Sequence, residues 1–167
     1  MLALLPDRLV TGLCTAGPVG TWGKAPGTNG TLVGLALYTV LFFPLGLVAE
    51  ALLIAALVAL AIPICDEGER RMQKRDPGEM ILDEIVAVPL CFLGLKAQLA
   101  ATGQVWLFML LGFGLFRLYD ILKPFGIRRL QRAPGGLGVV LDDLAAAVAT
   151  NLTLHLLLAL YRTALGT

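Results

Sequence analysis

Three long apolar stretches, separated by two polar segments, limit what this chain can fold into. They cover roughly residues 31–64, 85–116 and 141–161. The first contains a single charged residue, Glu50, the second contains only Lys96, and the third has none after its two opening aspartates. About 20 apolar residues are enough to cross the hydrocarbon core of a bilayer. Each stretch is therefore long enough to lie in lipid.

The composition supports a membrane protein. Hydrophobic residues make up 57% and charged residues 15% of the 167 residues, whereas about a quarter of a typical soluble domain is charged. A soluble domain of this size has too much surface for its volume to bury so many apolar side chains. Disorder, a basic nucleic-acid-binding domain and an ordinary cytosolic enzyme are excluded. We expect one membrane-embedded domain over residues 1–167.

Breaks within the apolar stretches predict the number of helices. The sequence Phe43-Pro44-Leu45-Gly46 divides the first stretch into two helices. The second stretch is interrupted at Lys96-Ala97-Gln98 and again at 101–104, which indicates a hairpin, and the third forms one helix. We expect an all-α, polytopic membrane bundle of about five helices, some of them short, tilted or half-inserted.

The basic residues predict the orientation of the bundle. Two hairpins return the chain to its starting side, so the N-terminal segment and the polar segments 66–84 and 117–143 share one face. Eleven of the 13 Lys and Arg residues lie on that face, and only Lys96 and Arg162 lie on the other. Because cytoplasmic loops carry the excess of basic residues, we expect the polar segments to face the cytoplasm.

The first polar segment contains two acidic motifs. Asp76-Pro77-x-Glu79 is typical of a helix start, with an N-cap acceptor, a proline and then a glutamate. On such a helix Asp83 lies two turns later on the face of Asp76, and Asp76 fits a capping role as well as a catalytic one. The pair Asp83-Glu84 directly precedes an apolar stretch, where carboxylates are costly and usually functional. A solvated helix end is the alternative.

The second polar segment begins with charges at three-residue steps. Arg117, Asp120 and Lys123 share one helical stripe, which Pro124 is expected to end. This pattern fits a salt-bridge ladder within the helix. It also fits two cations that bind a phosphate beside a metal.

The same segment ends in a glycine motif and an acidic pair. Gly135-Gly136-x-Gly138 lets the backbone approach a ligand closely, next to the free N–H groups of a helix start. One of Asp142 and Asp143 fits the cap of the last helix, which leaves the other carboxylate for a cation.

The two polar segments together place six acids and two cations on one membrane face. They are Asp76, Asp83, Glu84, Asp120, Asp142 and Asp143, with Arg117 and Lys123. Oxygen-rich sites with few nitrogen or sulfur ligands suit Mg²⁺. Mg²⁺ held by carboxylates beside basic residues implies phosphate chemistry at the depth of the lipid headgroups.

Four blocks of sequence carry a resemblance to a known family. They are Lys24-Ala-Pro-Gly-Thr-Asn-Gly-Thr31; Asp76-Pro77-Gly78 with Asp83-Glu84; Phe116-Arg117 with Asp120, Lys123-Pro124 and Ile127; and Gly135-Gly136 with Gly138, Asp142-Asp143 and Ala146. In this order they resemble the phosphatidylglycerophosphatase A family of bacterial, Mg²⁺-dependent membrane lipid phosphatases. The chain departs from the family pattern at Thr31, Ala87, Gly126, Gln131 and Ala147, and Gln131 stands where an aspartate is expected.

The resemblance implies hydrolysis of the phosphomonoester of phosphatidylglycerophosphate to phosphatidylglycerol and phosphate, in phospholipid biosynthesis at the bacterial cytoplasmic membrane. We expect Mg²⁺ to be held by Asp83, Glu84, Asp142 and Asp143. The expected catalytic carboxylates are Asp76, Asp83, Glu84 and Asp120, and the expected phosphate-binding residues are Arg117, Lys123, Lys24 and Thr28. The expected partners are the phospholipid substrate and membrane lipids, not nucleic acid.

Other functions remain as alternatives. One is a phosphatase for another anionic lipid phosphate. Another is a small transporter or channel subunit, for which the isolated Glu50 is the relevant feature. A transport pathway needs charges through the depth of the membrane, whereas the charges here gather on one face. We expect Glu50 to reach the far interface near Gly46.

A cysteine phosphatase is a third alternative. Cys65-x-x-Gly68-x-x-Arg71 has the spacing of a cysteine-phosphatase loop. However, the acids between Cys65 and Arg71 would repel both a thiolate and a phosphate, and that chemistry needs a thiolate in a positive pocket. We therefore expect the three cysteines to be small buried side chains.

Overall fold

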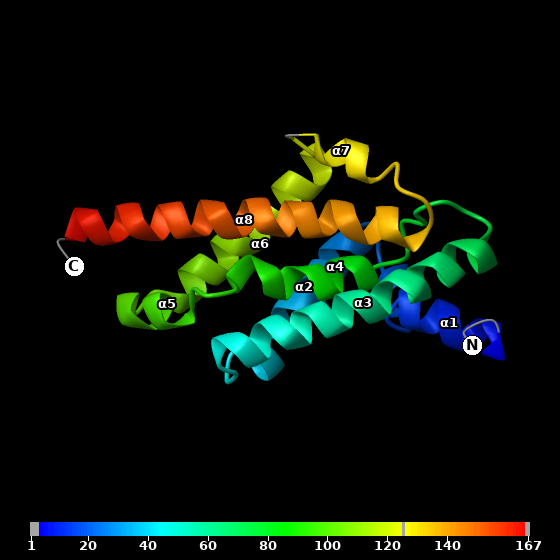
Figure 1. The fold of residues 1–167 in the computed structure, drawn as a ribbon, viewed down its shortest axis with the longest axis horizontal. Helices are drawn as coiled ribbons and strands as arrows, with labels where there is room; N and C mark the ends of the chain where they lie inside the picture. The colour runs from blue at the N-terminus through cyan, green and yellow to red at the C-terminus, as the bar shows by residue number, and fades with distance from the viewer. Residues whose placement is uncertain (1–3, 125, 166–167) are drawn as a thin grey trace.

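Two long helices, α3 and α8, form the frame of the molecule (Figure 1). The computed structural model describes residues 4–124 and 126–165, which contain helices and turns and no strand. In chain order the elements are α1 (Asp7–Cys14), a 3₁₀ turn (Val19–Thr21), α2 (Pro26–Leu37), a π-helical turn (Tyr38–Phe42), α3 (Leu47–Met72), α4 (Leu82–Ala87), the 3₁₀ helix η4 (Val88–Phe92), α5 (Lys96–Thr102), α6 (Val105–Leu122), α7 (Ile127–Leu130) and α8 (Gly136–Leu165).

The five expected helices are confirmed as α2 with its π-helical turn, α3, α4 with η4, α6 and α8. The short helices α1, α5 and α7 were not predicted. The first break lies at Phe43–Gly46, as expected. Of the two interruptions expected in the second stretch, the one at 101–104 is confirmed by the break between α5 and α6. The one at 96–98 is wrong, because these residues lie inside α5 and the chain turns instead at Gly94, where φ is +79°. Gly103, with φ of +68°, then separates α5 from α6.

The predicted helix start at Asp76 is wrong. Asp76 has φ of +46°, outside the helical region, and the helix begins only at Leu82. A helix that began at Pro77 would direct the Ile81 N–H to the Pro77 carbonyl. That N–H donates instead to the Cys14 carbonyl, at 2.9 Å, and ties the segment to α1. A long-range hydrogen bond therefore overrides a strong local signal.

The last helix starts earlier than expected. It begins at Gly136, so Asp142 and Asp143 lie in its second turn and cap nothing, contrary to the prediction. The end of α6 at Leu122, just before Pro124, is confirmed.

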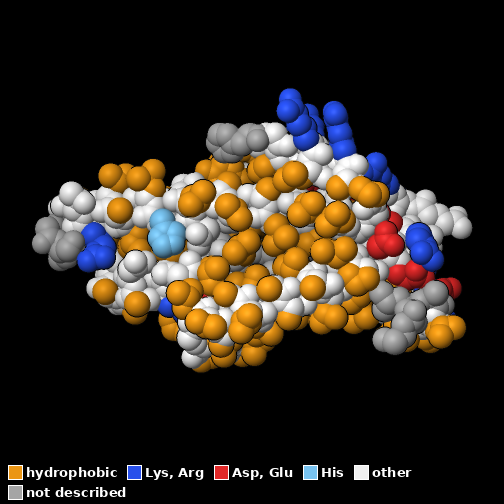
Figure 2. All heavy atoms as spheres, viewed as in Figure 1, with side chains coloured by type: hydrophobic (Ala, Val, Ile, Leu, Met, Phe, Trp, Pro, Cys, Tyr) orange, Lys and Arg blue, Asp and Glu red, His pale blue; other side chains and the backbone are white. Residues whose placement is uncertain are grey.

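Three helices are long and apolar enough to cross a membrane: α3, α6 and α8. The pair formed by α4–η4 and α5 would add a fourth span, with a bend of 66° between its halves. Large apolar side chains on the three long helices face outward, among them Leu52, Leu60, Trp106, Leu110, Leu152 and Leu156. Figure 2 shows hydrophobic side chains across the middle of one face, with basic side chains around α7 and the start of α8 and acidic ones near the C-terminal end of α3. The chain is a polytopic, all-helical membrane protein, and the prediction of fold class is confirmed.

Helix α4 occupies the centre of the bundle. It contacts α2, α3 and α8, and α8 also packs on α3, α6 and η4. Five of its six residues are buried, including the acidic pair Asp83 and Glu84. The arrangement therefore places two carboxylates inside the protein, at the end of the bundle that the polar segments cover.

A buried ion pair lies at the opposite end. Glu50, in the first turn of α3, is fully buried, and its Oε2 lies 2.9 Å from the Nζ of Lys96. Lys96 also donates to the carbonyls of Phe42 and Leu45, which flank the break before α3. Glu50 thus lies at the far end, as expected, but inside the bundle and not at its surface.

This pair predicts a large stability effect. Replacing Lys96 by Met leaves the buried Glu50 carboxylate without its cation, which we expect to lower the free energy of unfolding by about 3 to 5 kcal/mol. Unfolding in mixed detergent micelles measures the loss, with exposed Arg162→Ala as the control. The double variant K96M/E50Q should regain much of the stability, because it removes both charges. Equal stability of the single and double variants would contradict the role of the pair.

Candidate active site

The six acids singled out from the sequence line one cavity of about 120 Å³ at the polar end of the bundle. The segment between α3 and α4 supplies Asp76, α4 supplies Asp83 and Glu84, α6 supplies Asp120, and α8 supplies the last two. The complete lining is Asp76, Pro77, Gly78, Met80, Asp83, Glu84, Asp120, Lys123, Asp142 and Asp143. Four separated parts of the chain therefore meet in one acidic site.

The acidic pair of α4 is held deep in this site. Asp83 is 5% exposed and Glu84 is 8% exposed. Asp83 Oδ1 and Glu84 Oε2 are buried without a hydrogen-bond partner. Buried polar atoms in native proteins are nearly always paired, so these oxygens are the ones most suited to receive a ligand.

Two cations connect the acids across helices. Arg117 Nη1 donates to Asp120 Oδ2 at 2.8 Å and to Glu84 Oε1 at 3.0 Å. Lys123 Nζ donates to Asp142 Oδ2 and lies 3.8 Å from Asp120 Oδ1. The intrahelical ladder is therefore real, but each cation also reaches a carboxylate of another helix. The stripe of Arg117, Asp120 and Lys123 therefore forms part of the acidic site.

The charge state of Lys123 follows from its partners. Its burial acts to lower the pKa of the ammonium group, but the hydrogen bond that it donates to Asp142 and the charges of Asp142 and Asp120 together act more strongly. The net pKa is raised above that of an ordinary lysine. Lys123 therefore carries its positive charge at neutral pH.

Asp76 lies in the segment between α3 and α4, outside any helix, and lines the cavity. Its backbone N–H donates to Glu69 Oε1 at 2.7 Å, and its side-chain Oδ2 accepts a 2.5 Å hydrogen bond from Gln131 Nε2. In the sequence, Gln131 stands out only as the loss of an expected carboxylate. In the structure it positions Asp76, a role that no local pattern announces, because the two residues are 55 positions apart.

Two glycines of α2 allow the close approach of Glu84. A Cβ on Gly27 would overlap Glu84 Oε1 and lie 2.8 Å from the Arg117 guanidinium nitrogens. A Cβ on Gly30 would overlap Glu84 Oε2. Lys24 is exposed before α2 and Thr28 is half-buried in its first turn, and neither lines the cavity. Their assignment to phosphate binding stays a prediction.

The glycine motif before α8 serves packing. A Cβ on Gly135 would overlap Asp66 Oδ1, and one on Gly136 would overlap the backbone of α3 at Ile62 and Asp66. Gly136 N–H donates to Asp66 Oδ1 at 3.3 Å. The expected approach of backbone to a ligand is thus an approach of α8 to α3, and the two glycines lie outside the cavity lining.

Thiol chemistry is excluded at this site. Cys65 lies inside α3 and is fully buried, so the residues from Cys65 to Arg71 form helix and not a phosphate-binding loop. Burial raises the pKa of the Cys14 thiol to about 11, and the charge of Asp83 adds to the shift. Cys14 is therefore protonated at neutral pH, and a reactive thiolate is absent from this position.

The balance of charge in the cavity favours a cation. Six carboxylates face two basic side chains in a largely buried site, and uncompensated charge in such a place is unfavourable. Yet across residues 4–124 and 126–165 no three His, Cys, Asp or Glu side chains meet in an arrangement that could hold a metal ion. The donor chemistry suits a hard cation, and binding one requires the carboxylates to move closer together.

Comparison with known proteins identifies relatives of this chain. The sequence model of the phosphatidylglycerophosphatase A family matches residues 12–158. A phosphatidylglycerophosphatase A of Haemophilus influenzae is 35% identical over 126 residues, which cover 74% of this chain and 73% of the relative. The Escherichia coli protein of the same name is 27% identical over 125 residues, with coverage of 74% and 68%.

A third relative has a different name. The "Putative phosphatidylinositol-3-phosphatase" of Bacteroides thetaiotaomicron is 32% identical over 127 residues, which cover 74% of this chain and 77% of the relative. No solved structure matches the chain. All three relatives bear the names of phosphatases that act on phosphorylated phospholipids.

The packing of α2 against the site can be tested directly. In Gly27→Ala the new Cβ overlaps a carboxylate that is buried and bound by Arg117, so it cannot move away freely. We expect a loss of about 1 to 3 kcal/mol in the free energy of unfolding, the usual cost of overpacking. The matched control is Gly12→Ala, where a Cβ meets no atom within 4 Å. Unfolding in detergent compares the two, and an unaffected G27A variant would contradict this packing.

Proposed function

The chain belongs to the phosphatidylglycerophosphatase A family, and on that premise we propose that it hydrolyses phosphatidylglycerophosphate to phosphatidylglycerol and inorganic phosphate. Membership of the family makes the chain a lipid phosphatase. The observation that supports this substrate best is a cavity lined by six carboxylates and Lys123 at one end of a bundle of membrane helices, with Arg117 bound to two of those carboxylates. A site at the end of a membrane-spanning bundle lies at the depth of the lipid headgroups.

Mg²⁺ is the cofactor that we propose. Asp83, Glu84, Asp142 and Asp143 would hold it, and their buried oxygens are hard ligands of the kind that Mg²⁺ prefers. When bound, the ion would polarise the phosphoryl group and lower the charge that accumulates on it.

The protein's own cations would bind the phosphate. Arg117 and Lys123 each lie between carboxylates of different helices, so their positions are fixed before substrate arrives. Preorganised positive charge stabilises the negative charge that develops on the phosphoryl oxygens.

Asp76 is our choice for the group that accepts the proton of the attacking water. Asp120 is already engaged by both Arg117 and Lys123, whereas the Asp76 side chain accepts a hydrogen bond from the neutral amide of Gln131. Asp76 also lies on a segment outside the helices, where its carboxylate can turn toward a water molecule. Asp120 then serves to position the two cations.

The basic residues at the end of the bundle that holds the acidic cavity support an orientation in the membrane. It carries the polar segments, which hold most of the basic residues of the chain. We place this end in the cytoplasm, with the chain in the bacterial cytoplasmic membrane.

A phosphatase for another anionic lipid phosphate is the second candidate, which the name of the Bacteroides relative favours. Phosphate release from phosphatidylglycerophosphate, phosphatidylinositol 3-phosphate and phosphatidic acid in detergent distinguishes the candidates. We expect the highest kcat/KM for phosphatidylglycerophosphate. A clear preference for either of the other two lipids would replace the proposed substrate and keep the reaction.

Asp83 is the most informative residue to change. Asp83→Asn keeps the size of the side chain and removes its charge, and we expect kcat to fall by about 10² to 10³, the usual cost of losing one preorganised electrostatic group. Phosphate release measures the loss. The control is Glu79→Gln on the same segment, where the carboxylate is 41% exposed. Full activity of D83N would move the catalytic centre elsewhere.

Removal of metal tests the cofactor separately. Treatment with a chelator should abolish phosphate release, and added Mg²⁺ should restore it. Ca²⁺ should restore little, because it is larger and takes more ligands at longer distances. Phosphate release that persists after exhaustive chelation would exclude a metal-dependent reaction without excluding the phosphatase.

A further inference from the structure

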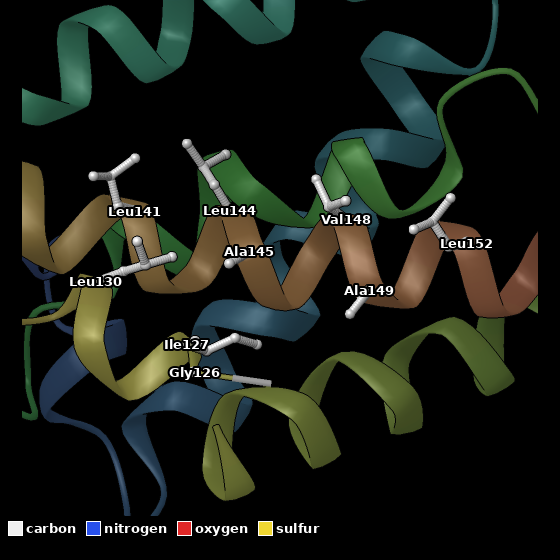
Figure 3. A pocket seen from close by; sticks show the side chains of 9 residues that line it. All are labelled: Gly126, Ile127, Leu130, Leu141, Leu144, Ala145, Val148, Ala149 and Leu152. Atoms are coloured by element: carbon white, nitrogen blue, oxygen red, sulfur yellow. The ribbon is translucent and has the colours of Figure 1, made fainter. Parts of the chain in front are cut away.

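A second cavity, wholly apolar, lies against the lipid-facing side of α8. It has a volume of about 540 Å³ and is lined by glycine and hydrophobic residues alone. Gly126, Ile127 and Leu130 form one wall, and a stripe of α8 from Leu141 to Leu152 forms the other (Figure 3). The stripe recurs at helical spacing and so presents one continuous apolar face.

The groove and the acidic cavity are lined by neighbouring residues of the same parts of the chain. Leu141 of the groove directly precedes Asp142 of the acidic cavity, and Gly126 follows Lys123 by three residues. The contact between Lys123 and Asp142 therefore joins two residues of the acidic cavity that are close in sequence to residues of the groove. From Leu141 to Leu152 the groove runs roughly 16 Å along α8, at 1.5 Å per residue. It leads from the phosphate site toward the middle of the membrane.

Helix α7 sets the depth at which the groove opens. Its Arg128 and Arg129 are exposed, while Ile127 is buried and, with Leu130, lines the groove. A short helix with basic residues on one side and apolar residues on the other lies at the boundary between headgroups and acyl chains. The groove therefore starts at headgroup depth, beside the cations that would bind phosphate.

We propose that this groove binds an acyl chain of the phospholipid substrate, an inference that rests on the proposed function. The polar end of such a lipid matches the acidic cavity with Lys123 in its lining, and its apolar end matches the groove on the neighbouring stripe of α8. An acyl chain in the bilayer is already in an apolar environment, so the groove contributes orientation more than hydrophobic burial. A chain held along α8 fixes the glycerol and its phosphate next to Lys123, and such positioning accelerates the reaction.

Filling the groove tests the proposal. Val148→Trp and Ala145→Trp place a large side chain in it, and Ala159→Trp, at an exposed position of α8 outside the lining, is the matched control. The substrates are dioleoyl- and dihexanoyl-phosphatidylglycerophosphate, because a six-carbon chain occupies only the start of the groove. We expect the groove variants to lose at least about tenfold in kcat/KM for the dioleoyl lipid and less than about twofold for the dihexanoyl lipid. The control should lose neither.

Each outcome decides between the two proposals. Equal losses on the two substrates, or no loss on the dioleoyl lipid, in variants with wild-type unfolding midpoints would overturn the acyl-chain groove alone. If V148W unfolds, A145W and the chain-length preference of the wild type provide the same test, because a groove that holds the chain favours the longer lipid. Wild-type protein that releases phosphate from neither lipid would overturn the proposed function, and the groove with it.

Discussion

The structure depends on keeping several carboxylates inside a membrane protein. A buried acid is unfavourable unless a cation or hydrogen bonds compensate it, and apolar surroundings increase the cost. Arg117 compensates Glu84 and Asp120 together, and Lys123 compensates Asp142. These bonds fix α6 relative to α4 and α8. The compact glycines of α2 are needed for the same reason, because any larger side chain would push Glu84 away from its cation.

Buried carboxylates are compensated differently at the two ends of the bundle. The difference indicates that only the end with the acidic cavity carries out chemistry. At the far end a single acid, Glu50, meets a single cation, Lys96, whose other contacts are backbone carbonyls. That site has no excess charge and serves structure. At the other end six carboxylates line one cavity, and two basic side chains bind only some of them, so acids outnumber cations. Between the two ends, residues 51–65 of α3 carry no charge, which is unlike a pathway for ions.

The sequence predicted the parts of the structure that depend on composition and local order. Long apolar stretches identified the five main helices. The six acids of the cavity were all singled out: the two acidic pairs from their position beside those stretches, Asp76 from its Asp-Pro-x-Glu motif and Asp120 from the stripe of charges. The errors arose where distant residues meet. The bond from Ile81 to Cys14 cancels a strong helix-start signal at Asp76, and Gln131 reaches Asp76 across 55 positions. No local pattern contains either contact, and the packing role of Gly136 is equally hidden without α3 beside it.

Helix α8 explains how one protein can bind both the charged phosphate and the apolar acyl chain of a phospholipid. Successive residues of an α-helix are about 100° apart, so Leu141 and Asp142 face different surroundings although they are neighbours. One stripe of α8 carries Asp142 and Asp143 into the acidic cavity, and the adjacent stripe faces the apolar groove beside α7. A phospholipid has the same division within one molecule. A lipid that arrives sideways from the bilayer can therefore place its phosphate among the charged groups while its acyl chain stays in apolar surroundings throughout, so that no part of it must cross an unfavourable environment to reach the site.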